Sequence, residues 1–195
     1  MRKILLATTN IHKINEYNDL FNKYSHQFQF ISLKDLDAQD DDAPETGDTF
    51  RANALEKAHY YAKKYQLAVI CDDSGLEVPS LNNFPGIYSK RWLEAKAFNY
   101  KIKQLLKMIN NKSNDCRYVC AIAYVDKYHQ NVFMGTIAGK LISPLSLQEG
   151  FGFDSGFYLP NYHKTFSKLD VEVKNNISHR TLAFKQLIKW LNTID

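Results

Sequence analysis

The spacing of apolar residues changes several times along the chain, and each change predicts a new element. Short apolar runs at Lys3–Ala7, Phe28–Leu33 and Leu67–Cys71 are typical of buried strands. Between these runs, apolar positions recur every three or four residues, which predicts amphipathic helices. The inner faces of the first two helices hold Ile14, Tyr17, Phe21 and Tyr24, and then Phe50, Ala54, Ala58, Tyr61 and Tyr65. This alternation of strand and helix favours an α/β fold.

The second half of the chain predicts another helix, a hairpin and a closing helix. A helix is expected over about Leu93–Asn111, with apolar residues along one side. Two β-rich runs, Arg117–Val125 and Asn131–Ile137, are joined by polar residues and predict an antiparallel hairpin. The last helix follows Ser178, a good N-cap residue, and has its apolar positions from Ala183 onward.

Length and composition place the chain among globular proteins. Its 195 residues, 45% hydrophobic and 24% charged, suit one domain over residues 1–195, in one or two lobes. A net charge of +4 suits a small anionic ligand and does not indicate nucleic-acid binding. Cys71, Cys116 and Cys120 lack the spacing of zinc or redox sites, so we expect buried thiols in the cytoplasm. The first apolar run is too short for a signal peptide or a membrane span.

Two adjacent carboxylates, Asp72 and Asp73, follow the third apolar run. We expect a buried strand to deliver both to its carboxyl edge and the chain to turn at Ser74-Gly75, because open α/β sheets bind ligands at that edge. Successive strand side chains point to opposite faces, so the two carboxylates need not share a role. The stretch therefore predicts either a catalytic metal site or a plain acidic turn.

The junction between the first strand and the first helix suits an anion. Thr8, Thr9 and Asn10 offer turn and N-cap chemistry, and the N–H groups of a helix start attract phosphate. Lys13 adds a full cation in the first turn. Many strand–helix units open this way, so the alternative is that Lys13 is simply solvated.

An acidic loop, Asp35–Asp48, precedes the second helix, which Thr49 can cap. Acidic runs of this kind are usually solvated. Pro44 and Gly47 nevertheless fix a turn around Glu45, directly before the helix. A carboxylate held there can join a metal site.

Three further cations are candidates for contact with an anionic ligand. Lys57 shares a helix face with Asn53, and it is either solvated or directed at the anion held by the first helix. His179 and Arg180 are expected in the first turn of the last helix, where positive charge opposes the helix dipole. Their position therefore predicts contact with an anion or a carbonyl oxygen.

Glycines and aromatic residues alternate in Gly150–Phe157. Glycine lets the backbone approach a ligand closely, and an aromatic face can stack on a flat base. The alternative is a β-bulge whose aromatic residues belong to the core.

Five motifs follow one another along nearly the whole chain. They are Thr8-x-Asn10-x-x-Lys13-x-x-Glu16; Glu45-x-Gly47-x-Thr49-Phe50-x-x-Asn53-Ala54-x-x-Lys57-Ala58; Asp72-Asp73-Ser74-Gly75-Leu76 with Pro85-Gly86-x-Tyr88-Ser89-x-Arg91; Phe151-Gly152-Phe153-Asp154; and Lys174-Asn175-x-x-Ser178-His179-Arg180. Each motif alone is modest, but the five in this order are highly specific. The chain resembles the inosine triphosphate pyrophosphatase family, the XTP/dITP diphosphatases of the Ham1 or RdgB type.

The resemblance implies that a nucleoside triphosphate is cleaved between its α- and β-phosphates, giving the monophosphate and pyrophosphate, with Mg²⁺ required. The expected substrates are the non-standard 6-oxo purine nucleotides dITP, ITP and XTP, which are thereby removed from the nucleotide pool. The expected fold is a long mixed sheet flanked by helices, in two lobes with the active-site cleft between them. The expected assembly is a homodimer, with neither nucleic acid nor membrane as a partner.

The resemblance also implies roles for individual residues. Asp73 matches the general base and a metal ligand, Glu45 a second acidic residue near the metal, and Asp72 a further candidate ligand. We expect the charge of Asp72 to raise the pKa of Asp73. Ser74 is expected beside the substrate, and Lys57 near its phosphates. The phosphate-binding segment comprises Thr8, Thr9, Asn10, Ile11, His12 and Lys13. The base-binding residues are Phe151, Gly152, Phe153, Asp154, Lys174, His179 and Arg180.

The chain departs from the family pattern at four places. Thr9 stands where glycine is usual, Ala52 replaces a glutamate, Asn82-Asn83 replaces Gly-Gly, and Ser155 replaces proline. The change at Ala52 gives Glu45 more weight as a metal ligand. The change at Ser155 predicts a looser turn in the base-binding segment, because serine lacks the fixed backbone angle of proline.

Two other functions are compatible with these residues. One is a Maf-like pyrophosphatase that acts on other modified nucleotides. The other is a non-enzymatic binder of nucleotide or nucleic acid that uses the positive charge and the aromatic residues. The pair His179-Arg180 and the segment Phe151–Asp154 favour the purine pyrophosphatase.

Overall fold

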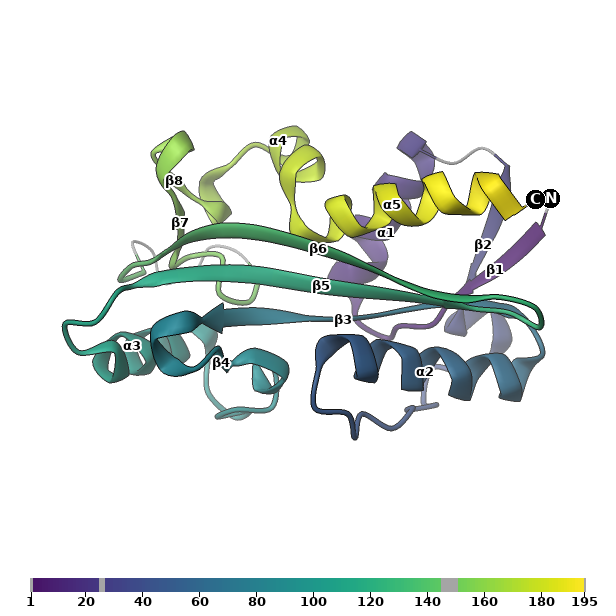
Figure 1. Ribbon diagram of the computed structural model, residues 1–195, viewed down its shortest axis with the longest axis horizontal. Coiled ribbons are helices and arrows are strands. Elements are labelled where there is room, and N and C mark those ends of the chain that lie inside the picture. The colour runs from purple at the N-terminus through teal and green to yellow at the C-terminus, as the bar shows by residue number, and fades with distance from the viewer. Residues whose placement is uncertain (1, 25–26, 145–150, 195) are drawn as a thin grey trace. The chain divides into compact units, whose positions relative to one another are not determined.

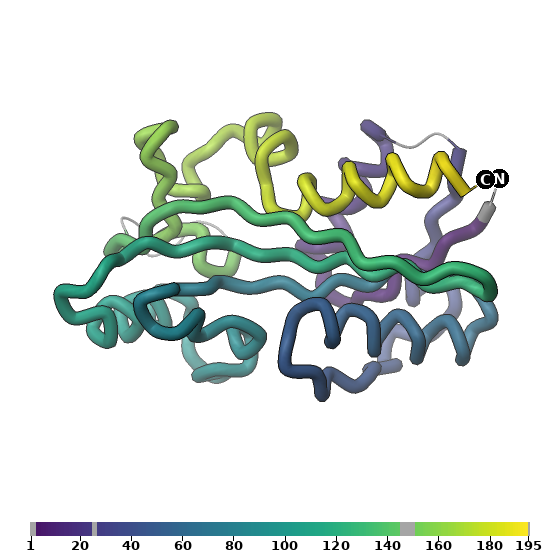
Figure 2. Tube along the Cα trace, in the orientation of Figure 1, coloured from purple at the N-terminus to yellow at the C-terminus, as the bar shows by residue number. Residues whose placement is uncertain are grey.

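The chain divides into two compact units in a computed structural model that describes residues 2–24, 27–144 and 151–194. Unit 1 comprises Met1–Asp73, Cys120–Gly135 and His179–Asp195, and unit 2 comprises Ser74–Val119 and Thr136–Ser178. The chain therefore passes several times from one unit to the other, as the trace in Figure 2 shows.

Unit 1 is built on parallel strands. Strand β1 (Arg2–Leu6) pairs in parallel with β2 (Phe28–Ser32) and with β3 (Ala68–Val78). Helices α1 (Ile11–Tyr24) and α5 (His179–Ile194) lie on one face of these strands, and α2 (Phe50–Tyr65) lies on the other (Figure 1). Parallel strands are covered on both faces in this way because the connecting helices must pack against them.

The core of unit 1 joins α1, α5 and the strands. Tyr17 and Phe21 of α1 pack edge-on against Phe184 of α5. The other buried members come from the strands and both helices: Ile4, Leu6, Leu20, Phe28, Ile70, Cys120, Ile122, Tyr124, Phe133, Ala183, Leu187, Ile188 and Leu191. This apolar contact sets α1 and α5 side by side.

Unit 2 has helices and short strands of its own, together with parts of the long strands. Its helices are α3 (Phe98–Ile109) and α4 (Val171–Ile177), and its short strands are β4 (Phe84–Pro85), β7 (Phe157–Leu159) and β8 (Lys164–Thr165). The 3₁₀ turns of unit 2 are Pro79–Leu81, Gly86–Tyr88, Pro160–Tyr162 and Phe166–Lys168, and Leu33–Leu36 forms one in unit 1. Its core contains Ile102 and Leu105 of α3 with Phe153, Phe157 and Phe166.

The strands form a mixed sheet in the order β2-β1-β3-β5-β6-β7-β8, with β4 paired to β3. The two longest strands, β5 (Asp115–Val125) and β6 (Gln130–Leu141), are neighbours joined by residues 126–129. Pairing is parallel between β1 and its neighbours and antiparallel at β4, β7 and β8. The expected mixed α/β sheet with flanking helices is therefore confirmed.

The expected turn at Ser74-Gly75 is wrong. Strand β3 runs unbroken from Ala68 to Val78, so both aspartates lie inside it. A side chain on Gly75 would lie 2.7 Å from the carbonyl oxygen of Gly86 and would overlap the hydroxyl of Ser89. Glycine therefore serves close packing inside a strand here, which local sequence cannot distinguish from a turn.

The expected helix over Leu93–Asn111 is too long. Leu93 has a left-handed backbone with φ of 50°, and helix α3 begins only at Phe98, because Ala97 before it has a non-helical ψ of 149°. Asn110, with φ of 39°, ends the helix as expected for a left-handed cap. Asn82 and Asn83 also have positive φ, so asparagine takes over the backbone role of the usual glycines.

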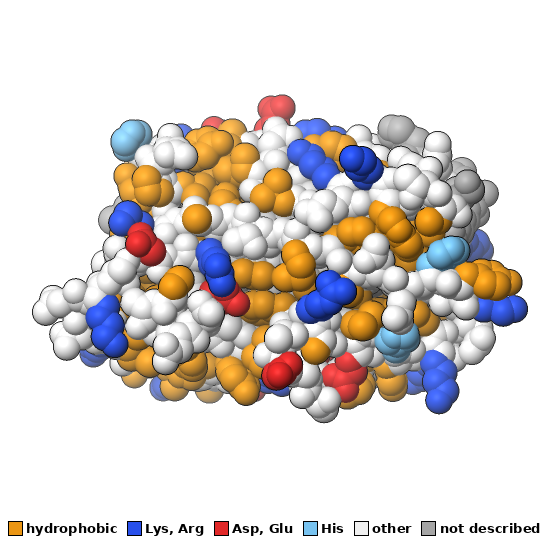
Figure 3. Space-filling view, viewed as in Figure 1, with side chains coloured by type: hydrophobic (Ala, Val, Ile, Leu, Met, Phe, Trp, Pro, Cys, Tyr) orange, Lys and Arg blue, Asp and Glu red, His pale blue; other side chains and the backbone are white. Residues whose placement is uncertain are grey.

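Side chains on the surface are mixed in character. On the face shown in Figure 3, basic residues are dispersed among polar and apolar ones. Among the described residues, every helix is too short or too polar to cross a membrane. Gly150, the first residue of the predicted base-binding stretch, lies outside the described residues.

Candidate active site

Asp72 is the centre of a buried ionic network in unit 1. Its side chain is only 1% exposed, and its Oδ2 lies 2.9 Å from Lys13 Nζ and 3.4 Å from Arg180 Nε. Strand β3 supplies the carboxylate, the first turn of α1 supplies Lys13, and the first turn of α5 supplies Arg180. Lys13 is therefore not a solvated residue, because its ammonium is paired with a buried anion.

Arg180 is held by two acidic residues and an aromatic ring. It is 4% exposed, forms an ion pair with Glu16 and lies 5.9 Å above the ring of Tyr17. Helix α5 can begin here because Gly135 of β6 has no side chain. A Cβ at Gly135 would overlap the carbonyl oxygen of His179 and come within 2.6 Å of Ala183 N.

The charges of this network keep Asp72 ionised. Burial alone would raise the pKa of Asp72, but Lys13, Arg180 and Lys57 hold that pKa below its usual value. Burial, together with the charge of Arg180, lowers the pKa of His179 well below its usual value. His179 is therefore neutral at pH 7, and Arg180 is the cation of this helix turn.

Asp73 points to the opposite face of β3 and meets helix α2. Asn53 Nδ2 donates to Asp73 Oδ2 at 3.0 Å. Lys57, one helical turn later, donates to Glu45 Oε1 at 2.5 Å and to the carbonyl oxygen of Asp72 at 2.9 Å. The shared face of Asn53 and Lys57 thus places an amide and an ammonium beside the predicted base.

Burial raises the pKa of Asp73, whereas the charge of Lys57 and the hydrogen bond from Asn53 lower it in part. The predicted rise is confirmed, but its main cause is loss of solvent and not the charge of Asp72. Burial lowers the pKa of Lys57, but the charges of Asp73, Glu45 and Asp72, with the hydrogen bond to Glu45, together raise it above its usual value, so the ammonium stays charged.

The acidic loop is fixed along α2. Asp41 accepts hydrogen bonds from Tyr60 Oη at 2.8 Å and Tyr65 Oη at 2.6 Å, and it pairs with Lys64 at 2.8 Å. Thr46 donates to Glu56 from both its amide and its hydroxyl, each at 2.7 Å. The expectation that this run is merely solvated fails for Asp41, and these contacts hold the segment around Glu45.

The phosphate-binding segment has the predicted cap. Asn10 Oδ1 accepts from the amides of His12 at 3.0 Å and Lys13 at 3.4 Å, and Thr8 Oγ1 accepts from the amide of Asn10 at 3.3 Å. Thr9 and His12 are exposed, and Ile11 is 60% exposed. The segment is therefore an ordered turn with an open outer side.

A second group of predicted residues lies in unit 2. Asp154 accepts a hydrogen bond from Tyr118 Oη at 2.9 Å, and its other oxygen pairs with Lys174 Nζ at 3.2 Å. Phe153 is 2% exposed and belongs to the core, whereas Phe151 is 37% exposed. The core interpretation is therefore correct for Phe153, and Phe151 is the aromatic side chain that offers a surface.

The predicted residues thus form groups within each unit. Lys13, Asp72 and Arg180 form one, and Glu45, Lys57 and Asp73 gather around Asn53 in the same unit. Ser74 belongs to unit 2, as do Phe151–Asp154 and Lys174. Among the residues that the structure describes, no three His, Cys, Asp or Glu side chains form a metal-binding group.

Three partners of these groups had no role assigned from the sequence, although one of them, Glu16, belongs to the first motif. Glu16 stands three residues after Lys13, a spacing that places both on one helix face and that can indicate a shared partner. Tyr118 and Gly135 gave no signal, because both act through segments far away in the sequence.

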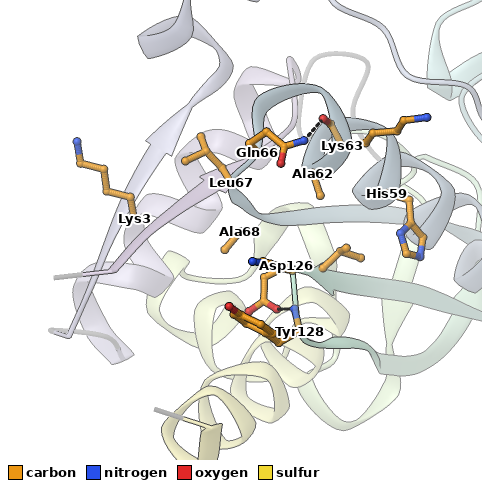
Figure 4. A pocket seen from close by; sticks show the side chains of 11 residues that line it. Lys3, His59, Ala62, Lys63, Gln66, Leu67, Ala68, Asp126 and Tyr128 are labelled. Atoms are coloured by element: carbon orange, nitrogen blue, oxygen red, sulfur yellow. Dashed lines mark hydrogen bonds between the residues drawn. The ribbon is translucent and has the colours of Figure 1, made fainter.

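A cavity of about 490 Å³ lies elsewhere in unit 1. It opens between the end of α2 and the turn after β5, with Asp126 and Tyr128 on one side and Gln66 and Leu67 on the other (Figure 4). None of the predicted site residues lines it.

Replacing Asp72 by asparagine is expected to reduce the free energy of unfolding by about 3–5 kcal/mol at pH 7, because a buried charge network loses one partner. Urea unfolding followed by circular dichroism measures this loss. The folded-state pKa of Asp72 is lowered, so its contribution is present above the unfolded value of about 3.9 and is lost as pH falls through the folded value. The difference between variant and wild type should therefore shrink in acid. Asp40→Asn, at an exposed position, is the matched control, and equal effects of the two substitutions would contradict the network.

Known proteins share the sequence pattern and the fold of this chain over most of its length. The sequence profile of the Ham1 family matches residues 4–190. A protein of Protochlamydia amoebophila (strain UWE25) named dITP/XTP pyrophosphatase is 38% identical, over 98% of this chain and 98% of that protein. One of the same name from Staphylococcus aureus (strain MW2) is 38% identical, over 98% and 97%.

Solved structures give the same result. The HAM1 protein from Coxiella burnetii has a TM-score of 0.88 at 30% identity, covering 99% of this chain and 100% of that one. The Staphylococcus aureus Ham1 protein has a TM-score of 0.87 at 36% identity, covering 100% of both chains. With sequence and fold in agreement over nearly its whole length, this chain belongs to the Ham1 family.

Proposed function

We propose that this protein is a nucleoside triphosphate pyrophosphatase that converts the non-standard purine nucleotides dITP, ITP and XTP to the monophosphate and pyrophosphate. The observation that carries the proposal is the buried carboxylate of Asp73, oriented by Asn53 and placed beside the Lys57–Glu45 pair. Relatives named dITP/XTP pyrophosphatase support it, since they align with almost the entire chain. Membership of the Ham1 family does not favour the Maf-like alternative.

Asp73 is the proposed general base. A general base must be ionised and aligned with the proton that it accepts. The hydrogen bond from Asn53 Nδ2 fixes the orientation of Asp73 Oδ2, and burial raises its pKa toward the working pH. The carboxylate then takes a proton from the attacking water more readily than an exposed aspartate does.

Mg²⁺ is the proposed cofactor, and the residues around Asp73 fit it. Mg²⁺ is usually held by one or two carboxylates together with substrate phosphates and water, so three protein carboxylates are not needed. Asp73 and Glu45 supply carboxylates, and Asn53 Oδ1 is a buried oxygen without a hydrogen-bond partner in the described part of the chain. When bound, Mg²⁺ would neutralise charge on the phosphates. We assign Asp72 to anchoring Lys13 and Arg180.

Phosphate binding is proposed for the N-terminal turn of α1 and two lysines. The Asn10 cap orders the turn, and the helix start carries a partial positive charge. Lys13 keeps further donors beside its bond to Asp72, since an ammonium has three N–H groups. Lys57 adds a second buried ammonium next to Asp73.

Base binding is proposed for the segment around Phe151. Its exposed ring offers a stacking surface. Lys174, paired with Asp154, is a donor for the 6-oxo group, which adenine lacks. Contact of His179 and Arg180 with the base stays a prediction.

We also propose that the enzyme is cytoplasmic and homodimeric. The three cysteines are free and buried, which suits a reducing compartment. The homodimer is proposed from the resemblance to the family.

Purified protein with Mg²⁺ should release pyrophosphate from dITP or XTP at least about tenfold faster than from dATP, because a hydrogen-bonding site discriminates against a substrate that leaves its donors unpaired. A panel of triphosphates with pyrophosphate detection measures this ratio. Chelation by EDTA should abolish the release. Equal rates on all purines would contradict the proposed specificity.

Asp73→Asn should reduce kcat by about 10²–10⁴-fold, the usual contribution of a general base. Its melting temperature should stay close to that of the wild type, because asparagine can still accept from Asn53. Steady-state kinetics and thermal unfolding measure the two quantities. Full activity in this variant would refute the assignment.

The acid limb of kcat/KM should lie above pH 4, because Asp73 must lose its proton to act and its pKa is raised above the usual value of about 3.9. Activity therefore falls as pH drops through the raised pKa. Lys57→Met removes the charge that lowers this pKa, so the limb should move to higher pH. Lys103→Met, at an exposed position of α3, is the control. An unchanged limb in the Lys57 variant would argue against Asp73 as the titrating group.

A further inference from the structure

The segment with Phe151 is a closed turn whose shape depends on its own backbone bonds. Asp154 N donates to the carbonyl oxygen of Phe151 at 3.2 Å, and Gly156 N donates to that of Phe153 at 3.0 Å. Gly152 has φ of 66°, a conformation that glycine adopts without strain. These bonds define the turn, but they do not by themselves fix where the turn lies relative to the rest of unit 2.

Besides the contacts of Asp154 with Tyr118 and Lys174, helix α3 contributes to that fixation through its first two residues. Ser155 is 4% exposed, and its Oγ donates to Asn99 Oδ1 at 2.6 Å. The ring of the neighbouring Phe98 lies 6.3 Å from the ring of Phe151 and 5.0 Å from that of Phe153. The polar contact and the ring contacts both join the turn to the start of α3.

The bond between Asn99 and Ser155 has a direct physical counterpart in proline. A proline at the position of Ser155 would limit the turn by fixing φ. Serine gives up this covalent restriction. The hydrogen bond from the buried Ser155 hydroxyl to Asn99 restricts the turn instead. Any movement that breaks this bond leaves a buried hydroxyl without its acceptor, which costs free energy.

We propose that Asn99 and Ser155 are a positioning pair that fixes the Phe151–Asp154 turn for recognition of the purine base. The inference rests on the proposed function, because the base is the ligand that this turn would receive. Ser155 directly follows the proposed base-binding residues Phe151–Asp154, and Asn99 contacts it from α3, so the pair acts through those residues. Loss of the pair weakens base binding and base discrimination, and it leaves the chemistry at Asp73 intact.

A double-mutant cycle tests the pair. Ser155→Ala and Asn99→Leu should each raise KM for dITP by roughly tenfold with kcat changed less than about twofold, as expected for the loss of one buried hydrogen bond used in binding. The double variant should be no worse than either single variant, because both remove the same bond. Asn99→Asp keeps the acceptor and should stay near wild type. Additive effects, or an unchanged KM in the single variants, would overturn the proposal.

A rescue experiment separates positioning from mere destabilisation. In the Asn99→Leu background, Ser155→Pro should bring KM for dITP and the dITP-to-dATP ratio back toward wild type, because the ring restricts the turn without a partner. Ser155→Ala in the same background should not. If proline and alanine behave alike there, the bond does not position the turn.

Hydrogen exchange provides a readout that does not depend on activity. Ser155→Ala should speed exchange of the Asp154 and Gly156 amides, while amides in the middle of β5 stay as protected as in the wild type. Unchanged exchange rates of these two amides would overturn the proposal that the pair positions the turn, even if the protein is active. If the wild-type protein releases no pyrophosphate from dITP, the proposed function is wrong. The exchange measurement still shows, in that case, whether the Asn99–Ser155 pair fixes the turn.

Discussion

The buried carboxylate of Asp72 is the constraint on which unit 1 depends. A charge without solvent must be compensated within the fold, and here cations brought to within a few ångströms do so. Lys13 and Arg180 meet this demand from helices near opposite ends of the chain, and Glu16 balances the second of them. The apolar core sets α1 and α5 together, but the ionic contacts select the register at which their first turns meet β3.

Asp73 shows the opposite outcome for the same residue type one position later. Alternation along β3 directs it toward α2, where one ammonium and one amide are its neighbours. With less positive charge around it than Asp72, burial dominates and its pKa rises. The pKa values of two adjacent aspartates therefore shift in opposite directions, because the strand separates their surroundings. In the proposed function, Asp73 is accordingly the base and Asp72 the anchor of the cations.

Local patterns predicted the fold well where the cause is local. The strand runs, the Asn10 and Thr49 caps and the start of α5 after Ser178 all follow from neighbours within four residues. The predictions failed where contacts between segments that are distant in the sequence determine the local structure. Gly75 sits in a strand because Ser89 and Gly86 pack on it, and Asp41 is ordered because α2 presents two tyrosines to it. For the site, residue types were predictable from motifs, whereas the ion pair of Arg180 with Glu16 was not, since it depends on which helices meet.

Gly135 has a consequence for how members of this family are recognised. The position lies outside every catalytic motif, yet the first turn of α5 rests directly on its bare backbone. A homologue with a larger residue there can match all five motifs and still be unable to seat its last helix in this manner. A match to the motifs therefore does not by itself show that a homologue seats its last helix in this way, and inspection of this one strand position offers a simple filter.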